Sequence, residues 1–157
     1  AAHQDEGWFY EQKLLGYNYR LSDMHAALGK SQLAKLDPFI EKRQGQAALY
    51  TAQLSGLPIT LPYVPDYTQS AWHIYVVELL VHDRKKVFNE LQKKGVGVNV
   101  HYIPIHTHPY YQALGFKWGD FPNAESYYNM ALTLPLFPTM SKDEQEFVVR
   151  SLREVLV

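Results

Sequence analysis

The chain has 157 residues, of which 46% are hydrophobic and 20% charged, with a formal net charge of −1. This length and apolar content suit one domain with a buried core, or a small domain with an extension. The charge gives no reason to expect a nucleic acid or membrane partner, and the absence of Cys excludes disulfides and thiolate metal sites, which leaves the cytoplasm as the default compartment.

The N-terminal part predicts an arm followed by a helix. Residues 1–20 are rich in aromatic side chains and show no clean period, so we interpret them as a loop or arm. Ser22 or Asp23 is a good N-cap, and apolar residues recur at helical spacing behind it from Met24.

A second helix follows directly. Asp37 predicts a cap with Pro38 at the first helical position, and the helix continues to Leu54. Several prolines then indicate an extended connector over 57–70. We therefore expect an N-terminal arm and long helical hairpin over 1–56, and a small domain over 57–157.

The remainder alternates between strand and helix patterns, which predicts an α+β fold with a sheet covered by helices. In chain order we expect a strand at 73–81, a helix at 83–94, a strand at 96–102, a proline-containing loop at 102–111, a helix at 123–131, an extended piece at 132–137, and a last helix introduced by a capping box of Ser141 and Glu144.

Two clusters could carry chemistry. The first is Tyr17, Asn18, Tyr19 and Arg20, where amide and guanidinium donors suit a phosphate or carboxylate, although a capping loop packed on the core would look the same.

The second cluster is His101, Tyr102, His106 and His108. Three histidines could bind zinc, but the spacing is irregular and no acidic residue stands nearby, so hydrogen bonding to a polar ligand or plain surface exposure explains them better. We expect no metal site. No phosphate-binding, dinucleotide-binding or hydrolase motif is present.

Long stretches in one order resemble the DegT/StrS family of pyridoxal-phosphate sugar aminotransferases, and most of all its pseudaminic acid pathway members. They are GYNYRLSDMHAALGKSQL, LDPFIEKR, SAWHIYVV, GVNVHYIPIHTHPYY and GDFPNAESYYNMALTLPLFPTMS. The resemblance implies the C-terminal small domain of a fold type I aminotransferase, with leading helices before a small, mainly antiparallel sheet. It also implies that the large domain with the Schiff-base lysine is missing, so that this chain alone is inactive.

The resemblance further assigns residues. Asn18 matches the asparagine that reaches the cofactor phosphate of the neighbouring subunit in a homodimer, and Arg20 is placed to meet substrate charge. Tyr102 is the best match in the sugar-nucleotide loop, with His101 and His106 weaker. The whole enzyme would move an amino group from glutamate to C4 of a UDP-4-keto-6-deoxy-N-acetylhexosamine.

Two departures and two alternatives accompany this assignment. His25 stands where glutamine is more usual, and Thr107-His108 replaces a pair that more often reads Leu-Gln, so the exact sugar stays open. Another UDP- or dTDP-4-ketosugar is one alternative. The other is an interaction domain that kept the dimer surface and lost the chemistry.

Overall fold

The structure is a computed structural model that describes residues 11–17, 19–80 and 83–156. The chain divides into two compact units, residues 1–35 and residues 36–157, and each is described by itself. Within the described residues, every helix is too short or too polar to cross a membrane.

The first unit carries helix α1 (Asp23–Leu33). The Ser22 hydroxyl caps it by accepting the backbone N–H of His25, and it also lies 2.7 Å from His25 Nδ1. Ser22 is thus confirmed as the N-cap. No residue of α1 is buried, and Met24 and Leu28 are exposed. Because this helix buries no apolar face, intrinsic propensity and its cap are what favour it locally.

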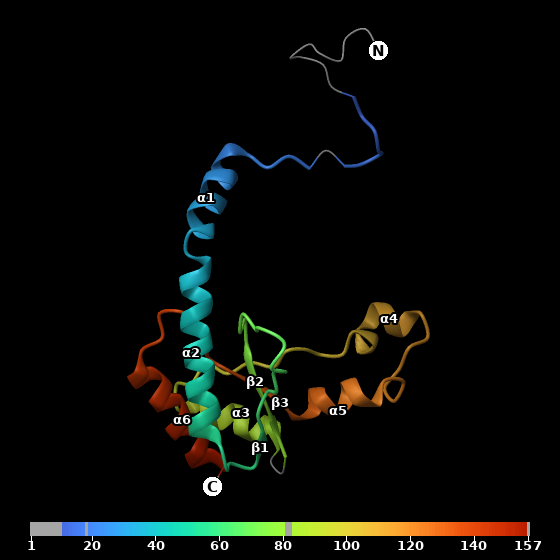
Figure 1. Cartoon of the computed structure of the whole chain (residues 1–157). Coiled ribbons are helices and arrows are strands. Elements are labelled where there is room, and N and C mark those ends of the chain that lie inside the picture. The colour runs from blue at the N-terminus through green and yellow to red at the C-terminus, as the bar shows by residue number, and fades with distance from the viewer. Residues whose placement is uncertain (1–10, 18, 81–82, 157) are drawn as a thin grey trace. The chain divides into compact units, whose positions relative to one another are not determined.

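The second unit holds all the other described elements (Figure 1). They are α2 (Leu36–Leu54), β1 (Ile59–Thr60), β2 (Tyr75–Leu79), α3 (Arg84–Lys93), the 3-10 turn η1 (Ile105–Thr107), α4 (Pro109–Ala113), α5 (Pro122–Met130), β3 (Ala131–Leu134) and α6 (Lys142–Leu156).

The strands form one antiparallel sheet in the order β1-β2-β3. Ile59 pairs with Leu79, and Tyr75 pairs with Leu134. In β2 the buried residues alternate with partly exposed ones, as expected for a strand with one face on the core. The predicted small antiparallel sheet and the α+β fold are confirmed.

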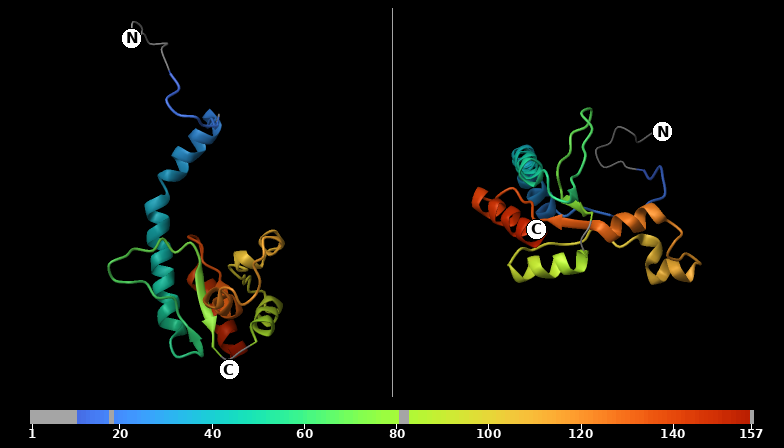
Figure 2. Two further views of the ribbon diagram at one scale, coloured as in Figure 1. Left: turned by 90° about the vertical axis from the view of Figure 1, so that its right-hand side faces the viewer. Right: turned by 90° about the horizontal axis from the view of Figure 1, so that it is seen from below.

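Helices α2, α3 and α6 supply the rest of the core. Helix α6 contacts both α2 and α3 and lies between them in the view from below (Figure 2). The core joins buried residues of these helices to β2 and β3, among them Tyr50, Leu54, Tyr75, Val77, Leu91, Leu132 and Leu152. Helix α2 therefore packs in the second unit. The division at residue 56 stays a prediction.

Local caps explain where several elements begin and end. The Asp83 side chain accepts the backbone N–H of Lys85 at the start of α3, and Gly95 follows its end with φ of 86°. A positive φ of this size is easy for glycine and strained for other residues, so glycine is favoured at this stop.

Three expectations were wrong in detail. Asp37 does not cap the second helix, because α2 begins at Leu36 and Asp37 lies in its first turn. The predicted strand over 96–102 is reduced to one bridge between Asn99 and Thr133. The reason is that Val98 N donates to Val96 O, and Gln92 Nε2 donates to Val98 O, so local partners take groups that a strand ladder would need. The predicted loop at 102–111 also contains η1 and the start of α4.

Candidate functional site

The segment 101–108 leaves the sheet directly after the Asn99 bridge and leads into α4. His101 is tied to the sheet, because its Nδ1 lies 2.9 Å from the hydroxyl of Thr133 on β3. Its Nε2 lies 3.3 Å from the side-chain nitrogen of Asn99. Both ring nitrogens of His101 therefore have hydrogen-bond partners, and the start of the segment is anchored to β3.

The other end of the segment is anchored by His106. Its side chain is 8% exposed, and its Nε2 lies 2.8 Å from Glu125 Oε1 on α5. The ring also packs against Phe121, with ring centroids 4.8 Å apart. Next to it, the buried Thr107 hydroxyl donates to the carbonyl of Pro104 at 2.7 Å. Thr107, which is expected to depart from the family pattern, thus forms a hydrogen bond within the segment.

The carboxylate of Glu125 accepts several hydrogen bonds. Besides His106, its carboxylate accepts the backbone N–H of Gly119 at 2.8 Å and that of Phe121 at 3.3 Å. Burial raises the pKa of Glu125, but the hydrogen bonds from His106 and from these two amides together outweigh burial, so the pKa lies below its ordinary value of 4.5. The carboxylate is therefore held in its ionised form.

Between the two anchored histidines Pro104 is buried, and the other side chains are exposed. Tyr102 is 69% exposed, and Ile103 and Ile105 are exposed as well. A largely apolar hollow of about 480 Å³ lies beside them, lined by Ile103, Pro104, Ile105, His106, Tyr111, Phe116, Phe121 and Ala124. Tyr111 brings a phenol to this lining, and an apolar surface with a few polar groups suits a ligand such as a sugar, which has both an apolar face and hydroxyl groups.

The predicted residues of the N-terminal cluster belong to the other unit. Asn18 lies outside the described residues. Arg20 is exposed, and the rings of Tyr17 and Tyr19 stack with centroids 5.3 Å apart. The structure thus brings His101, Tyr102 and His106 together on one segment, and it has Arg20 in the first unit.

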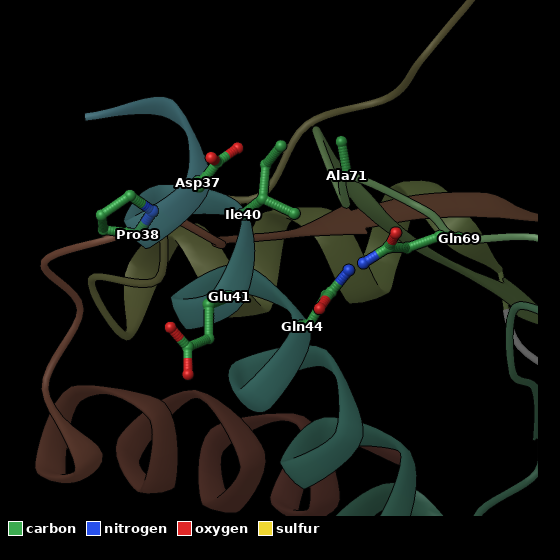
Figure 3. Close-up of a pocket in the computed structure, with 7 residues that line it drawn as sticks. All are labelled: Asp37, Pro38, Ile40, Glu41, Gln44, Gln69 and Ala71. Carbon is green, nitrogen blue, oxygen red and sulfur yellow. The ribbon is translucent and has the colours of Figure 1, made fainter. Parts of the chain in front are cut away.

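A second hollow, of about 550 Å³, lies at the start of α2 (Figure 3). The side-chain amides of Gln44 and Gln69 face each other there, and the carboxylate of Glu41 points away from both. Gln44 Nε2 also donates to the carbonyl of Ser70 at 3.2 Å. Because the polar groups do not converge on one point and no predicted site residue lines the hollow, we do not assign a ligand to it.

The described residues do not build a cofactor cradle or a metal centre by themselves. Every lysine of the chain is described, and every one is exposed rather than set in an apolar pocket where a Schiff base could be shielded. Among the described residues no group of three or more His, Asp or Glu side chains could hold a metal ion, which gives the zinc alternative no support.

Sequence reasoning missed Glu125 and Thr133. Glu125 stands in the first turn of a helix, which is a common position for a capping glutamate and could have been noticed. Its pairing with His106, 19 residues earlier, depends on the course of the chain through α4 and has no local signal.

The sequence that forms this arrangement matches one protein family. Residues 2–153 match the model of the DegT/DnrJ/EryC1/StrS aminotransferase family. The chain belongs to this family. The resemblance found in the sequence is thereby confirmed.

Relatives and solved structures agree with the assignment. The chain is 38% identical over 159 residues to the spore coat polysaccharide biosynthesis protein SpsC of Bacillus subtilis, covering 95% of this chain and 40% of that protein. It is 34% identical over 155 residues to the UDP-4-amino-4,6-dideoxy-N-acetyl-beta-L-altrosamine transaminase of Campylobacter jejuni, again with 95% and 40% covered. The chain thus spans about 40% of the length of these relatives.

The fold matches solved aminotransferases. DesV of S. venezuelae, solved in complex with a ketimine intermediate, has a TM-score of 0.85 at 33% identity, covering 92% of this chain and 39% of DesV. The PMP form of the putative sugar aminotransferase Spr1654 of Streptococcus pneumoniae has a TM-score of 0.86 at 26% identity, with 98% and 40% covered. Helicobacter pylori PseC, an aminotransferase of pseudaminic acid biosynthesis, has a TM-score of 0.82 at 26% identity, with 98% and 42% covered.

Proposed function

We propose that this chain is the C-terminal part of a pyridoxal-phosphate-dependent nucleotide-sugar aminotransferase. The complete enzyme would move an amino group from glutamate to C4 of a UDP-4-keto-6-deoxy-N-acetylhexosamine, in the synthesis of a surface glycan of the pseudaminic acid type. The observation that carries the proposal is the family match over residues 2–153, supported by the likeness to the altrosamine transaminase and to PseC.

Within this proposal each candidate residue has a role. Asn18 binds the phosphate of the cofactor held by a second copy of the protein, and Arg20 meets negative charge on the substrate. Tyr102 contacts the sugar nucleotide, and His101 and His106 belong to the same binding segment. An exposed tyrosine between two anchored ends supports this, because a ligand-binding side chain is most effective when its backbone is held in place.

Pyridoxal phosphate, when bound, supplies the electron sink for the exchange of the amino group. Its lysine partner is proposed to lie in the part of the enzyme outside this chain. The residues present act only in binding and orientation.

The assembly follows from the shared site. We propose a homodimer in which each site takes residues from both copies, as isologous interfaces allow. Exposed apolar side chains on the arm and α1, such as Leu15, Tyr19 and Met24, support a surface that is covered in the assembly. We propose a cytoplasmic enzyme, with neither nucleic acid nor membrane as a partner.

The deciding experiment is an absorbance spectrum of the protein made from the complete reading frame, mixed with pyridoxal phosphate and then with glutamate. We expect a cofactor band typical of a lysine-bound aldehyde, and its conversion to the pyridoxamine form. A complete protein that carries the expected lysine and yet gives no such band would overturn the enzyme proposal.

A second candidate is the same reaction on another UDP- or dTDP-4-ketosugar. It is favoured by similarly related proteins that have other names, such as SpsC and DesV. The family resemblance also implies that Thr107-His108 departs from the usual pair in this segment. Side-by-side assays with the two ketosugar pools separate these candidates. The remaining candidate is an interaction domain without chemistry, which gains support if the reading frame starts at or near Ala1.

A further inference from the structure

Both ends of the exposed 101–106 segment are held by histidine rings, but the two anchors differ in kind. His101 is fixed to Thr133 on a sheet strand, which is a rigid neighbour. His106 is fixed to Glu125, on a helix that follows a long excursion of the chain. The second anchor is therefore the one whose loss would free the segment most.

Glu125 does more than cap its own helix. A cap at the start of α5 needs only a backbone donor near the helix start, such as the N–H of Phe121. Glu125 in addition accepts from Gly119, with distances of 2.8 and 2.9 Å to its two oxygens, and from the His106 ring. One carboxylate thus connects the end of the 101–106 segment, the turn before α5, and α5 itself.

The pair is also shielded from water. The side chains of His106 and Glu125 are 8% and 13% exposed, and Phe121 and Trp118 lie against the imidazole. A hydrogen bond to an ionised group in such a setting is stronger than one on the surface, and its removal leaves buried polar atoms unpaired. A buried ring with its Nε2 committed to a carboxylate is poorly placed to bind a substrate directly.

We propose that Glu125, acting through His106, is a positioning residue of the nucleotide-sugar site, and that it holds the 101–106 segment so that Tyr102 meets the sugar nucleotide in a fixed geometry. This inference rests on the proposed function. His106 then supports the site without touching the substrate, and the contact itself belongs to Tyr102.

The kinetic test uses the complete enzyme and follows its two half-reactions separately. E125Q replaces the ionised acceptor by an amide whose NH₂ group faces donors. We expect KM for the ketosugar to rise roughly tenfold, as the loss of a charge-assisted hydrogen bond would give. The half-reaction with glutamate should stay unchanged, because the segment contacts only the sugar nucleotide.

Two histidine variants and one control sharpen the test. H106Q keeps an N–H donor near the place of Nε2, so it should retain most of the wild-type affinity for the ketosugar. H106L has no such donor and should behave like E125Q. E146Q removes an exposed carboxylate on α6, away from the segment, and should leave both half-reactions as in the wild type. Equal losses in both half-reactions for E125Q, or no change in KM, would overturn the proposal.

Amide hydrogen exchange provides a readout without turnover. In E125Q the amides of Gly119 and Phe121 and the peptide 101–108 should exchange faster, while the amides of α6 stay protected and show that the fold is intact. Unchanged exchange in these segments contradicts the proposal. A wild-type enzyme that turns over no nucleotide sugar would refute the proposed function instead, and the positioning role with it.

Discussion

Arg43 on α2 donates through Nη1 to the backbone carbonyl of Leu136 at 3.0 Å, although the two residues are 93 positions apart in the chain. The same nitrogen lies 3.1 Å from the carbonyl of Trp72 and 3.2 Å from that of His73. Trp72 has a positive φ of 49°, which is an uncommon conformation for a bulky residue. One partly buried guanidinium therefore joins α2, the segment before β2 and the segment after β3.

Replacing Arg43 by methionine keeps most of the apolar stem and removes the donors. We expect the variant R43M to lose about 1–3 kcal/mol of the free energy of unfolding, because carbonyls that are partly buried lose a charged partner. Urea unfolding followed by circular dichroism measures this. K42M, which changes the adjacent exposed lysine, is the matched control and should differ little from the wild type. Equal midpoints for R43M and K42M would show that the guanidinium bonds contribute no net stability.

The phenol of Tyr50 is fully buried and donates to the carbonyl of Pro135 at 2.8 Å. Y50F should therefore cost about 1–2 kcal/mol of unfolding free energy, since that carbonyl loses its partner. Y110F, which changes an exposed ring, serves as the control and should be neutral. A Y50F variant as stable as Y110F would mean that another donor replaces the phenol.

The same phenol predicts a dependence on alkaline pH. Burial, with a smaller contribution from Tyr75, raises the pKa of Tyr50 above its ordinary value of 10.0. A raised pKa in the folded state contributes stability that is complete below pH 10 and is lost as the pH rises above it. Wild-type stability should therefore fall above pH 10, and the fall should be shallower in Y50F. Parallel curves for the two proteins would contradict this assignment.

The start of α6 shows that the ends of helices can be predicted from local sequence. The predicted capping box is present, because Ser141 N donates to Glu144 Oε2 at 2.7 Å and Glu144 N donates to Ser141 Oγ at 3.2 Å. The cap at Ser22 was predicted for the same reason, because it depends on residues within one turn. The cap at Asp83 and the stop at Gly95 are equally local.

Features that depend on distant partners could not be predicted in this way. The valines of 96–102 have a strand pattern, yet a Gln92 side chain takes one of the carbonyls. His106 looks like a surface residue in the sequence, and only the path through α4 and α5 brings Glu125 to its ring. Residue chemistry pointed to the clusters that contain Asn18, Arg20 and Tyr102, but the roles of these residues came from the family resemblance and remain predictions.

The capping box also predicts a response to acid. The backbone N–H and then the hydroxyl of Ser141 lower the pKa of Glu144 below its ordinary value of 4.5. A lowered pKa in the folded state contributes stability above pH 4.5 that is lost as the pH falls through the lowered value.

S141A should cost about 1 kcal/mol of unfolding free energy at neutral pH, as removal of an N-cap generally does.

Acid unfolding of E144Q tests the carboxylate itself. In this variant the decrease of stability below pH 4.5 should be smaller than in the wild type. E146Q, two positions further along α6 and exposed, is the control and should follow the wild-type curve. If E144Q and E146Q show the same acid dependence, the cap does not perturb the carboxyl group.

The proposed sharing of sites between two copies leads to a prediction for mixed dimers. One parent carries N18A, and the other parent lacks the Schiff-base lysine of the complete enzyme, so that each homodimer is inactive. In a mixed dimer one site combines the intact lysine of the first copy with the intact Asn18 of the second. Random mixing in equal amounts forms such dimers half of the time, with one working site each, so about one quarter of the wild-type activity should return. Activity is measured after the parents are unfolded and refolded together, with each parent refolded alone as the control. A mixture that stays as inactive as its parents, although size-exclusion chromatography shows dimers, would mean that Asn18 serves the site of its own copy.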